Sequence, residues 1–334
     1  MGVRLKVLVT GGTGFVGLNI VEALLARGDE VVVASDAELP PYARGVLERL
    51  PGTLKDIRAD VADARAVDAM FAEHRPEKVV HAAVITAGEA REFTSFDRIV
   101  DVNLKGTAHV LAAAVAQGVR RLVYTSSGSA YGRALVGGGT VTEDTPAQPD
   151  NLYSITKHAS ERVCARFREL RGLDVVWARL GSVFGPWERN TGVRDSLSLQ
   201  FQVFRHVLAG NEVVLPRIEA RRDWVYSRDV ASGILSLLDA DTLRHQLYNL
   251  SSGIDWTNYG MRWCEALRHT MPQLRFRVAE EGEAANVSFL GHRDRAMMSI
   301  GRLRAETAFR PRAASDDVFP EFVAWLGAHR RYHE

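Results

Sequence analysis

The 334-residue chain has few of the features that mark several specialised classes of protein. Its two cysteines, Cys164 and Cys264, are too few for a disulfide framework, and we expect both to be reduced packing residues of a cytoplasmic enzyme. Its ten histidines show no metal-ligand spacing, so we expect no metal. With 42 Lys and Arg against 41 Asp and Glu, the charge of +1 provides no overall field for nucleic acid or an anionic membrane. We find no apolar run near the roughly 18–20 residues of a spanning helix, and no signal-peptide stretch at the start.

The first 180 residues alternate short β-branched runs with longer helical patterns. Apolar residues at consecutive positions are typical of parallel strands that helices cover on both faces. The alternation therefore predicts an α/β fold with a Rossmann-type doubly wound parallel sheet. The predicted strands are residues 7–10, 30–34, 55–59, 78–82, 121–126 and 174–180, and the predicted helices are 16–27, 64–73, 96–117 and 153–170.

A glycine turn stands between the first predicted strand and the first predicted helix. Gly11, Gly14 and Gly17 recur at the spacing of a dinucleotide-binding loop, and Gly12 fits an alternative register. Such glycines allow a tight turn, a close approach of the backbone to pyrophosphate, and close packing of helix on strand. The amides at the start of the helix, which begins near Phe15 and Val16, would then bind the phosphates.

An acidic residue ends the second predicted strand, about 20 residues past the glycine loop, where a ribose-binding residue is expected. This residue is Asp36, whose carboxylate would accept hydrogen bonds from ribose hydroxyls and repel a 2′-phosphate, which favours NAD. Ser35 and the nearby Arg44 leave NADP as the less favoured alternative. Asp60, followed by Val61, either meets the adenine or caps the next helix.

The change of pattern after residue 186 predicts a second, smaller domain. Polar and charged residues become more frequent, and one further strand is expected at 246–249. We expect an NAD-binding domain of residues 1–180 plus about 225–250, and a substrate-binding domain of about 181–224 plus 251–334. The three glycines at 137–139 predict a surface loop between the fifth strand and the next helix.

Tyr153 and Lys157 lie four residues apart, on one face of a predicted helix. A free phenol has a pKa near 10, and a nearby ammonium group favours its ionised form. Tyr153 is therefore a candidate base toward a secondary alcohol. Hydroxyl side chains, Ser127 and Ser129 among them, gather at the end of the fifth strand, at the edge where such sheets bind ligands.

Together these motifs resemble the extended short-chain dehydrogenase/reductases, in particular the NAD-dependent epimerase/dehydratase family that includes UDP-glucose 4-epimerase. The resemblance implies that Ser127 binds the substrate oxygen, that Tyr153 is the acid/base, and that Lys157 holds the ribose and lowers the pKa of the tyrosine. Asn103 corresponds to the family's active-site asparagine, with a helix cap as the alternative. The resemblance spans nearly the whole chain, through residues 10–17, 80–83 (which include Ala82 and Ala83, candidate cofactor contacts), 101–107, 179–186, 222–230 and 299–311.

Departures from the family pattern narrow the chemistry. Gly128 and Ser129 stand where dehydratases of the family carry an Asp-Glu pair, which argues against a 4,6-dehydratase. Ser182 replaces the diphosphate-binding asparagine of nucleotide-sugar epimerases, and residues 216–218 replace their Gly-Asp-Gly loop. The pair 181–182 also looks like sugar-acid dehydrogenases of the same superfamily. Arg222 stands where epimerases bind a phosphate, with a salt bridge to Asp223 or Asp229 as the alternative.

We therefore predict an NAD-dependent epimerase or oxidoreductase acting on a secondary alcohol of a sugar or nucleotide sugar. The alternatives are an NAD(P)-dependent dehydrogenase of a free sugar acid or polyol, and a non-catalytic dinucleotide-binding sensor or scaffold. We expect no nucleic-acid or membrane partner. The predicted substrate contacts are Thr86, Ser127, Ser129, Ser182, Arg189, Arg194 and Arg222.

Other conspicuous residues are expected to pack rather than to react. His81 is expected to be a buried strand-end residue, and Trp187, Trp224 and Trp256 to be packing groups. Family relatives commonly pair the helices near 96–117 and 153–170, which implies a homodimer. Leu104, Val110, Leu111, Ala114 and Ala159 would let those helices approach closely.

Overall fold

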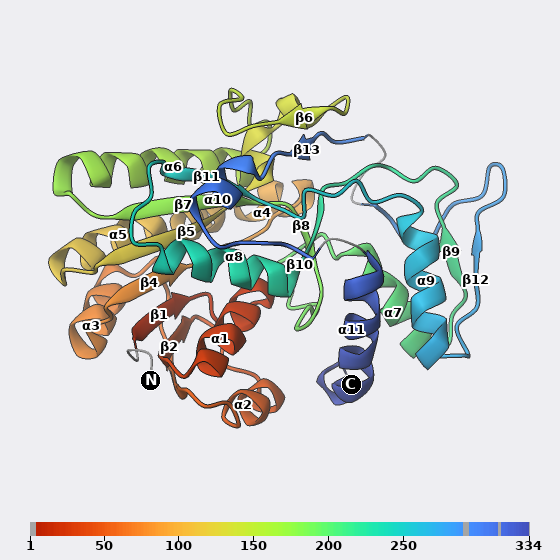
Figure 1. The fold of residues 1–334 in the computed structure, drawn as a ribbon, viewed down its shortest axis with the longest axis horizontal. Helices are drawn as coiled ribbons and strands as arrows, with labels where there is room; N and C mark the ends of the chain where they lie inside the picture. The colour runs from red at the N-terminus through yellow and green to blue at the C-terminus, as the bar shows by residue number, and fades with distance from the viewer. Residues whose placement is uncertain (1–4, 290–293, 313–314, 334) are drawn as a thin grey trace.

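The computed structural model describes residues 5–289, 294–312 and 315–333 (Figure 1). Its main feature is a seven-stranded sheet in the order β11-β7-β5-β4-β1-β2-β3, in which every neighbouring pair is parallel. All seven predicted strands are therefore present, and the predicted fold class is confirmed. The strands are β1 (Lys6–Thr10), β2 (Glu30–Ser35), β3 (Thr53–Arg58), β4 (Lys78–His81), β5 (Arg121–Ser127), β7 (Val175–Leu180) and β11 (Leu247–Leu250).

Helices cover both faces of this sheet. One layer contains α1 (Phe15–Arg27) packed on α8 (Ser227–Asp239), and the other contains α3 (Ala64–His74), α5 (Gly106–Ala116) and α6 (Leu152–Arg171). The predicted helix 96–117 is part of a longer one, in which α4 (Glu89–Val100), the π-helical turn η1 (Asp101–Lys105) and α5 follow one another directly, with a kink at Ser95 inside α4. The short α2 (Pro41–Leu47) was not predicted from the sequence.

The strand residues alternate between two cores because successive side chains point to opposite faces of a sheet. Val7, Val9 and Val31 belong to the core that includes α1, whereas Leu8 and Val32 belong to the core that includes α3 and α5. The predicted packing of both cysteines is confirmed, since Cys164 and Cys264 are fully buried and unpaired.

The rest of the chain forms small two-stranded units and helices beside the main sheet. β8 (Ser182–Phe184) pairs with β10 (Trp224–Tyr226), β9 (Val213–Leu215) with β12 (Phe276–Val278), and β6 (Thr140–Val141) with β13 (Met297–Met298). The helices are α7 (Leu199–Leu208), α9 (Tyr259–Thr270), α10 (Gly301–Glu306), α11 (Ser315–Ala328) and the 3₁₀ turn η4 (Arg330–Tyr332). The three tryptophans predicted to pack are all buried. The proposed division into two domains stays a prediction.

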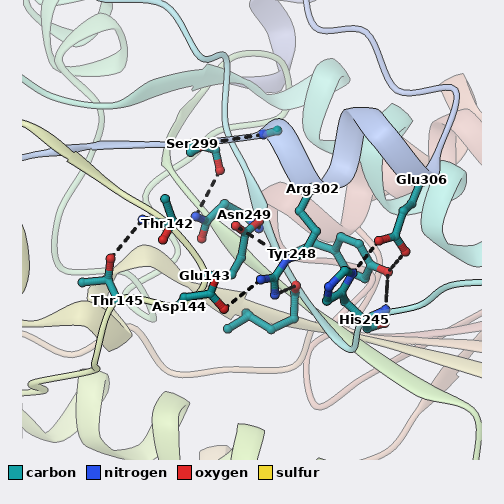
Figure 2. A network of polar contacts seen from close by, with 12 residues as sticks. Thr142, Glu143, Asp144, Thr145, His245, Tyr248, Asn249, Ser299, Arg302 and Glu306 are labelled. Carbon is teal, nitrogen blue, oxygen red and sulfur yellow. Dashed lines mark hydrogen bonds and ion pairs between the residues drawn. The ribbon is translucent and has the colours of Figure 1, made fainter.

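Side chains cap β11, a strand at the edge of the sheet (Figure 2). The backbone N–H of Asn249 donates to the Glu143 carboxylate at 2.9 Å, and Arg302 donates to the Leu247 carbonyl oxygen at 3.4 Å. Arg302 also pairs with Asp144 at 2.9 Å, which links α10 to the loop after β6. These contacts block further strand pairing at this edge, a common protection against aggregation.

The helix Glu89–Ala116 is long and apolar enough to cross a membrane by length and composition, with a mean hydropathy of 1.3 in its best window. The expectation that no segment reaches this length is therefore corrected. Half of that window is buried within the protein, where α5 packs against α3 and α6. A buried core helix meets the same criterion, so the feature is weak support for a membrane span.

Candidate active site

A cavity of about 580 Å³ lies at the carboxyl ends of the parallel strands, where doubly wound sheets bind ligands. Its walls come from the segments that follow β1, β2, β3, β4, β5 and β7. Residues from the segment after β8 and from the approach to β13 complete it. The cavity brings together most predicted site residues, namely Gly11, Gly14, Phe15, Val16, Asp36, Asp60, Val61, Ala82, Ala83, Thr86, Ser127, Ser129, Tyr153, Lys157, Ser182, Arg189 and Arg194.

The glycine loop fits the pyrophosphate of a dinucleotide. Gly11 has φ +67°, and a Cβ there would lie 2.6 Å from the Ala83 backbone. A Cβ at Gly17 would collide with the Gly11 carbonyl oxygen. The N-cap of α1, Gly14, has no side chain to cap the helix, so the first amides of α1 remain available to phosphate oxygens at the cavity.

Two carboxylates line the cavity after β2 and β3, at the positions predicted to meet the adenosine. Asp36 and Asp60 are both bound by Arg98, at 3.4 Å and 2.8 Å respectively. Burial raises the pKa of Asp60, but the Ala62 amide and Arg98 together hold it below its usual value. Asp60 is not the cap of α3, because Asp63 accepts the hydrogen bonds from the first amides of that helix.

The structure places two arginines, Arg44 and Arg98, differently from what the sequence suggested. Arg44, considered earlier as a partner for a 2′-phosphate, instead pairs with Asp56 at 2.7 Å and does not line the cavity. Sequence reasoning missed Arg98, which lies on α4, far along the chain from both carboxylates. No local pattern pointed to it.

Tyr153 stands in the first turn of α6, which a reciprocal capping box of Asn151 and Ser154 fixes. Burial raises the pKa of the Tyr153 phenol, whereas hydrogen bonds with Ser127 and Thr86 lower it, and so does the positive charge of Arg194. Ser127 also donates to the Ser129 hydroxyl at 3.1 Å. Three hydroxyl groups from three different segments therefore converge on one corner of the cavity.

Lys157 lies one helical turn after Tyr153 and is 2% exposed. Its ammonium group donates to the Thr125 carbonyl oxygen at 2.6 Å. Burial lowers its pKa to about 7, with partial compensation from Glu161. In this structure the positive charge that lowers the pKa of Tyr153 comes from Arg194. The effect of Lys157 on the tyrosine, which the family resemblance implied, remains an expectation.

A buried ion pair supports this corner from behind. Arg179 on β7 donates to both oxygens of Glu161 on α6, at 2.9 and 2.6 Å, and both side chains are 3% exposed. Ser126 donates to the same carboxylate at 2.5 Å. Despite burial, Arg179 keeps the pKa of Glu161 below its usual value. The pair fixes α6, and with it Tyr153, against β5 and β7.

The substrate end of the cavity differs from expectation at one arginine. Arg222 is 2% exposed and does not line the cavity; it donates to the Arg221 carbonyl oxygen at 2.7 Å, and burial lowers its pKa to about 10. The predicted placement of Arg222 on the substrate is thus not supported. Its neighbour Asp223 and the distant Arg295 line the cavity instead. Arg295 reaches it because β13 pairs with β6, a contact that no sequence pattern revealed.

Asn103 is also placed differently from the prediction. It is 1% exposed within η1, does not line the cavity and caps no helix. Its amide group accepts from the Ile85 N–H at 2.8 Å and donates to the Ile85 carbonyl oxygen at 3.0 Å. Asn103 thus holds the cavity wall after β4, and its predicted contact with the cofactor stays a prediction. His81, as predicted, is a buried residue, bound between Thr10 and Thr107.

The doubly wound sheet, the glycine loop after β1 and the Tyr153–Lys157 helix define an extended short-chain dehydrogenase/reductase. The model of the NAD dependent epimerase/dehydratase family matches residues 7–251. The chain belongs to this family and is an NAD-dependent enzyme. Within the described residues, no group of three or more His, Cys, Asp or Glu side chains could hold a metal ion; the predicted absence of a metal stays a prediction.

Relatives share the length of the chain at modest identity. A dTDP-glucose 4,6-dehydratase of Actinoplanes sp. is 26% identical, with 98% of this chain and 99% of the relative aligned. A UDP-glucose 4-epimerase of Corynebacterium glutamicum is 29% identical over 75% of this chain and 76% of its own. The NAD complex of the UDP-glucose 4-epimerase of Thermus thermophilus has a TM-score of 0.78 at 28% identity, covering 97% of this chain and all of the other.

Proposed function

We propose that the protein oxidises a secondary alcohol of a nucleotide sugar and reduces the resulting ketone on its opposite face, a net epimerisation. The observation that carries this proposal is the convergence of the Ser127, Thr86 and Tyr153 hydroxyls in the cavity that also contains the glycine loop. Several of the relatives and structural neighbours have a nucleotide sugar in their names, including the epimerases of C. glutamicum and T. thermophilus.

Each of the three catalytic residues has a separate task. Tyr153 accepts the proton of the sugar hydroxyl as the alcohol is oxidised and returns it when the ketone is reduced. Ser127 donates a hydrogen bond to the same oxygen and is itself oriented by the Ser129 amide at 3.1 Å. Lys157 contributes a buried cation beside the cofactor ribose. Bound NAD, held by the glycine loop with Asp36 and Asp60, supplies the hydride acceptor.

The structure supports oxidation without elimination of water. Elimination needs a further acid and base next to Ser127, and this chain has Gly128 and Ser129 there. A side chain at 128 would place its Cβ 2.8 Å from the Met298 sulfur and 3.2 Å from the Leu180 carbonyl oxygen. A carboxylate at 128 would therefore require the Met298 side chain to move. This favours an epimerase over a dehydratase, although named dehydratases are among the relatives.

Cationic side chains at the substrate end suit an anionic substrate group. Arg189 and Arg295 line this end, and they would bind the diphosphate of a nucleotide sugar. The second candidate function is a net dehydrogenase of a free sugar acid, because these arginines suit a carboxylate equally well. Ser182 also lines the cavity, where nucleotide-sugar epimerases carry an asparagine that binds the diphosphate. This shorter side chain favours the sugar-acid dehydrogenase.

The test is an assay of purified protein with added NAD. UDP- and dTDP-sugars are incubated and analysed for epimers by NMR, and sugar acids are assayed for NADH at 340 nm. Epimer formation without net NADH supports the proposal, with Tyr153→Phe as the inactive control. Stoichiometric NADH from a sugar acid, with no inhibition by UDP or dTDP, would establish the dehydrogenase instead. Retained NAD without turnover of either class would indicate a sensor or scaffold.

A further inference from the structure

Arg98, on α4, connects two carboxylates that follow different strands of the main sheet. Its Nη1 lies 2.8 Å from an oxygen of Asp60, after β3, and its Nη2 lies 3.4 Å from an oxygen of Asp36, after β2. All three side chains line the cavity. Because the ribose-binding residue of a dinucleotide site stands at the end of the second strand, this guanidinium group lies beside the position expected for the adenosine ribose.

The two carboxylates are held to different extents. Asp60 is engaged on both oxygens, because Oδ1 accepts from the Ala62 N–H at 2.9 Å and Oδ2 faces Arg98. Asp36 is held more loosely, since its side chain is 60% exposed and the Ser35 hydroxyl is 3.5 Å from its Oδ1. Asp36 therefore keeps acceptor capacity for ribose hydroxyls. Asp60, by contrast, holds Arg98 in place whether or not Asp36 carries a charge.

Two other arginines near these strands are used elsewhere. Arg44 pairs with Asp56 at 2.7 Å, and Arg58 donates to the backbone carbonyl oxygen of Asp36 at 3.2 Å. Neither of them lines the cavity, whereas Arg98 does. Of these three arginines, Arg98 is thus the one that can meet a ligand beside Asp36.

The balance of charge in this group opposes a phosphate. Two carboxylates, Asp36 and Asp60, surround one guanidinium group, so the cluster carries a net negative charge that repels the 2′-phosphate of NADP. Replacing Asp36 by Asn removes the excess charge, and the amide can still hydrogen-bond a ribose hydroxyl. Asp60 would continue to hold Arg98 in that variant, so the substitution changes the charge and leaves the cation where it is.

We propose that Arg98 determines, together with Asp36, which dinucleotide the cavity accepts. In the wild-type protein Asp36 neutralises Arg98 and repels a 2′-phosphate, so the site selects NAD. Without the charge of Asp36, Arg98 binds the 2′-phosphate, because a guanidinium group offers paired donors that match phosphate oxygens. The chain therefore contains a latent NADP site that a single carboxylate closes. This inference concerns cofactor binding and does not depend on which sugar is the substrate.

Calorimetric titration of the cofactor-free protein with NAD and with NADP tests the inference. We expect Asp36→Asn to bind NADP about tenfold to a hundredfold more tightly than the wild type, because repulsion is removed and a charge-assisted hydrogen bond is gained. The same variant should bind NAD up to about tenfold more weakly, since the ribose loses a charged acceptor. Adding Arg98→Gln to Asp36→Asn should remove the gain for NADP and leave the affinity for NAD nearly unchanged.

The ratio of the two dissociation constants separates selectivity from stability. A substitution that only loosened α4 would weaken both cofactors alike, whereas loss of the phosphate contact changes their ratio. The Arg98 side chain is 40% exposed, so its replacement should cost little stability, and retained NAD binding reports that each variant is folded. Arg98→Lys in the Asp36→Asn background keeps the positive charge and should retain part of the NADP gain.

Arg44→Gln, also combined with Asp36→Asn, is the matched control, because Arg44 lies outside the cavity. It should leave the NADP gain intact. The inference is overturned if Asp36→Asn gains no affinity for NADP, if the gain persists after Arg98→Gln, or if Arg44→Gln removes it equally. The titrations contain no sugar, so a failure to find sugar turnover would count against the proposed function alone.

Discussion

The ammonium nitrogen of Lys157 lies 2.6 Å from the carbonyl oxygen of Thr125, inside a site where the lysine is 2% exposed. Burial is the largest influence on this group and lowers its pKa to about 7. A protonated Lys157 is therefore costly in the protein without cofactor. Active sites often retain such groups at the expense of stability because the reaction needs them.

Lys157→Met should stabilise the cofactor-free protein while abolishing turnover. Because the pKa of Lys157 is lower in the folded state, the unfolded chain binds more protons between pH 7 and 10.5, and wild-type stability should rise with pH across that window. The Met variant lacks this rise. We expect a gain of about 1–3 kcal/mol at pH 6, reduced by the lost bond to Thr125 and shrinking toward pH 10.

Urea unfolding at pH 6, 8 and 10 measures this difference, with Lys105→Met as the control because Lys105 is exposed and pairs with Asp101 on its own helix. A Met variant that is less stable than wild type at pH 6 would show that the hydrogen bond outweighs the cost of the buried charge.

Glu161→Ala should be strongly destabilising, because it leaves Arg179 charged and buried without its partner. Removing one member of a buried ion pair typically costs about 3–5 kcal/mol. Glu169→Ala, on the same helix, breaks an exposed pair with Arg166 and should cost at most about 1 kcal/mol. Denaturant midpoints of both variants provide the comparison, and similar losses for the two would contradict the assigned role of the Glu161–Arg179 pair.

Tyr153→Phe should lower turnover by orders of magnitude while leaving NAD affinity nearly unchanged, because the phenol is proposed to act only in proton transfer. Ring packing is conserved by the substitution, so the loss cannot be assigned to misfolding. Initial rates and NAD binding by calorimetry are measured on the same preparation. A variant that keeps even a third of wild-type activity would exclude Tyr153 as the acid/base.

How much the sequence predicted depends on whether a feature is local. The strands of the main sheet and helices α1, α3 and α6 follow from apolar periodicity, and the glycine loop from residues close together in the chain. Arg98 and Arg295 could not be found this way, since tertiary contacts alone bring them to the cavity. Arg222 shows the converse: its motif position was recognisable, but the direction of its side chain depends on packing that no motif specifies.

Of the five contact residues predicted for the homodimer, Leu104 and Ala159 are partly exposed and the other three are buried. Val110, Leu111 and Ala114 are fully buried within one chain and cannot meet a partner. The large exposed apolar side chains on the packed helices α4 and α6 include Phe93 (90% exposed), Phe96 and Ile155. We expect a second copy to cover them, because large exposed apolar side chains on neighbouring helices are candidates for an interface.

Replacing both Phe93 and Phe96 by Asp should therefore convert the dimer into a monomer, as measured by light scattering at micromolar concentration. Ile218→Asp changes a residue whose exposure, 80%, lies between those of Phe93 and Phe96 but which is far from these helices in sequence, and it should leave the mass unchanged. A monomeric wild-type protein would rule out the dimer.

The ion pair between Arg91 and Asp195 should also control how long NAD stays bound, because Val193 and Arg194 line the cavity assigned to the cofactor. Epimerisation requires the cofactor to remain in place between oxidation and reduction, so a segment between β8 and α7 that this ion pair holds in place suits the proposed function.

Both side chains of the Arg91–Asp195 pair are about one-third exposed, at 30% and 29%, so the pair contributes at most about 1 kcal/mol. Arg91→Ala or Asp195→Asn should therefore speed NADH release up to about fivefold. Stopped-flow fluorescence measures the rate, and the exchanged pair Arg91→Asp with Asp195→Arg should recover part of it. Arg166→Ala, which removes an exposed arginine outside the cavity, is the control. Equal release rates in all variants would mean that the segment does not limit cofactor exit, and the net dehydrogenase would then gain weight over the epimerase.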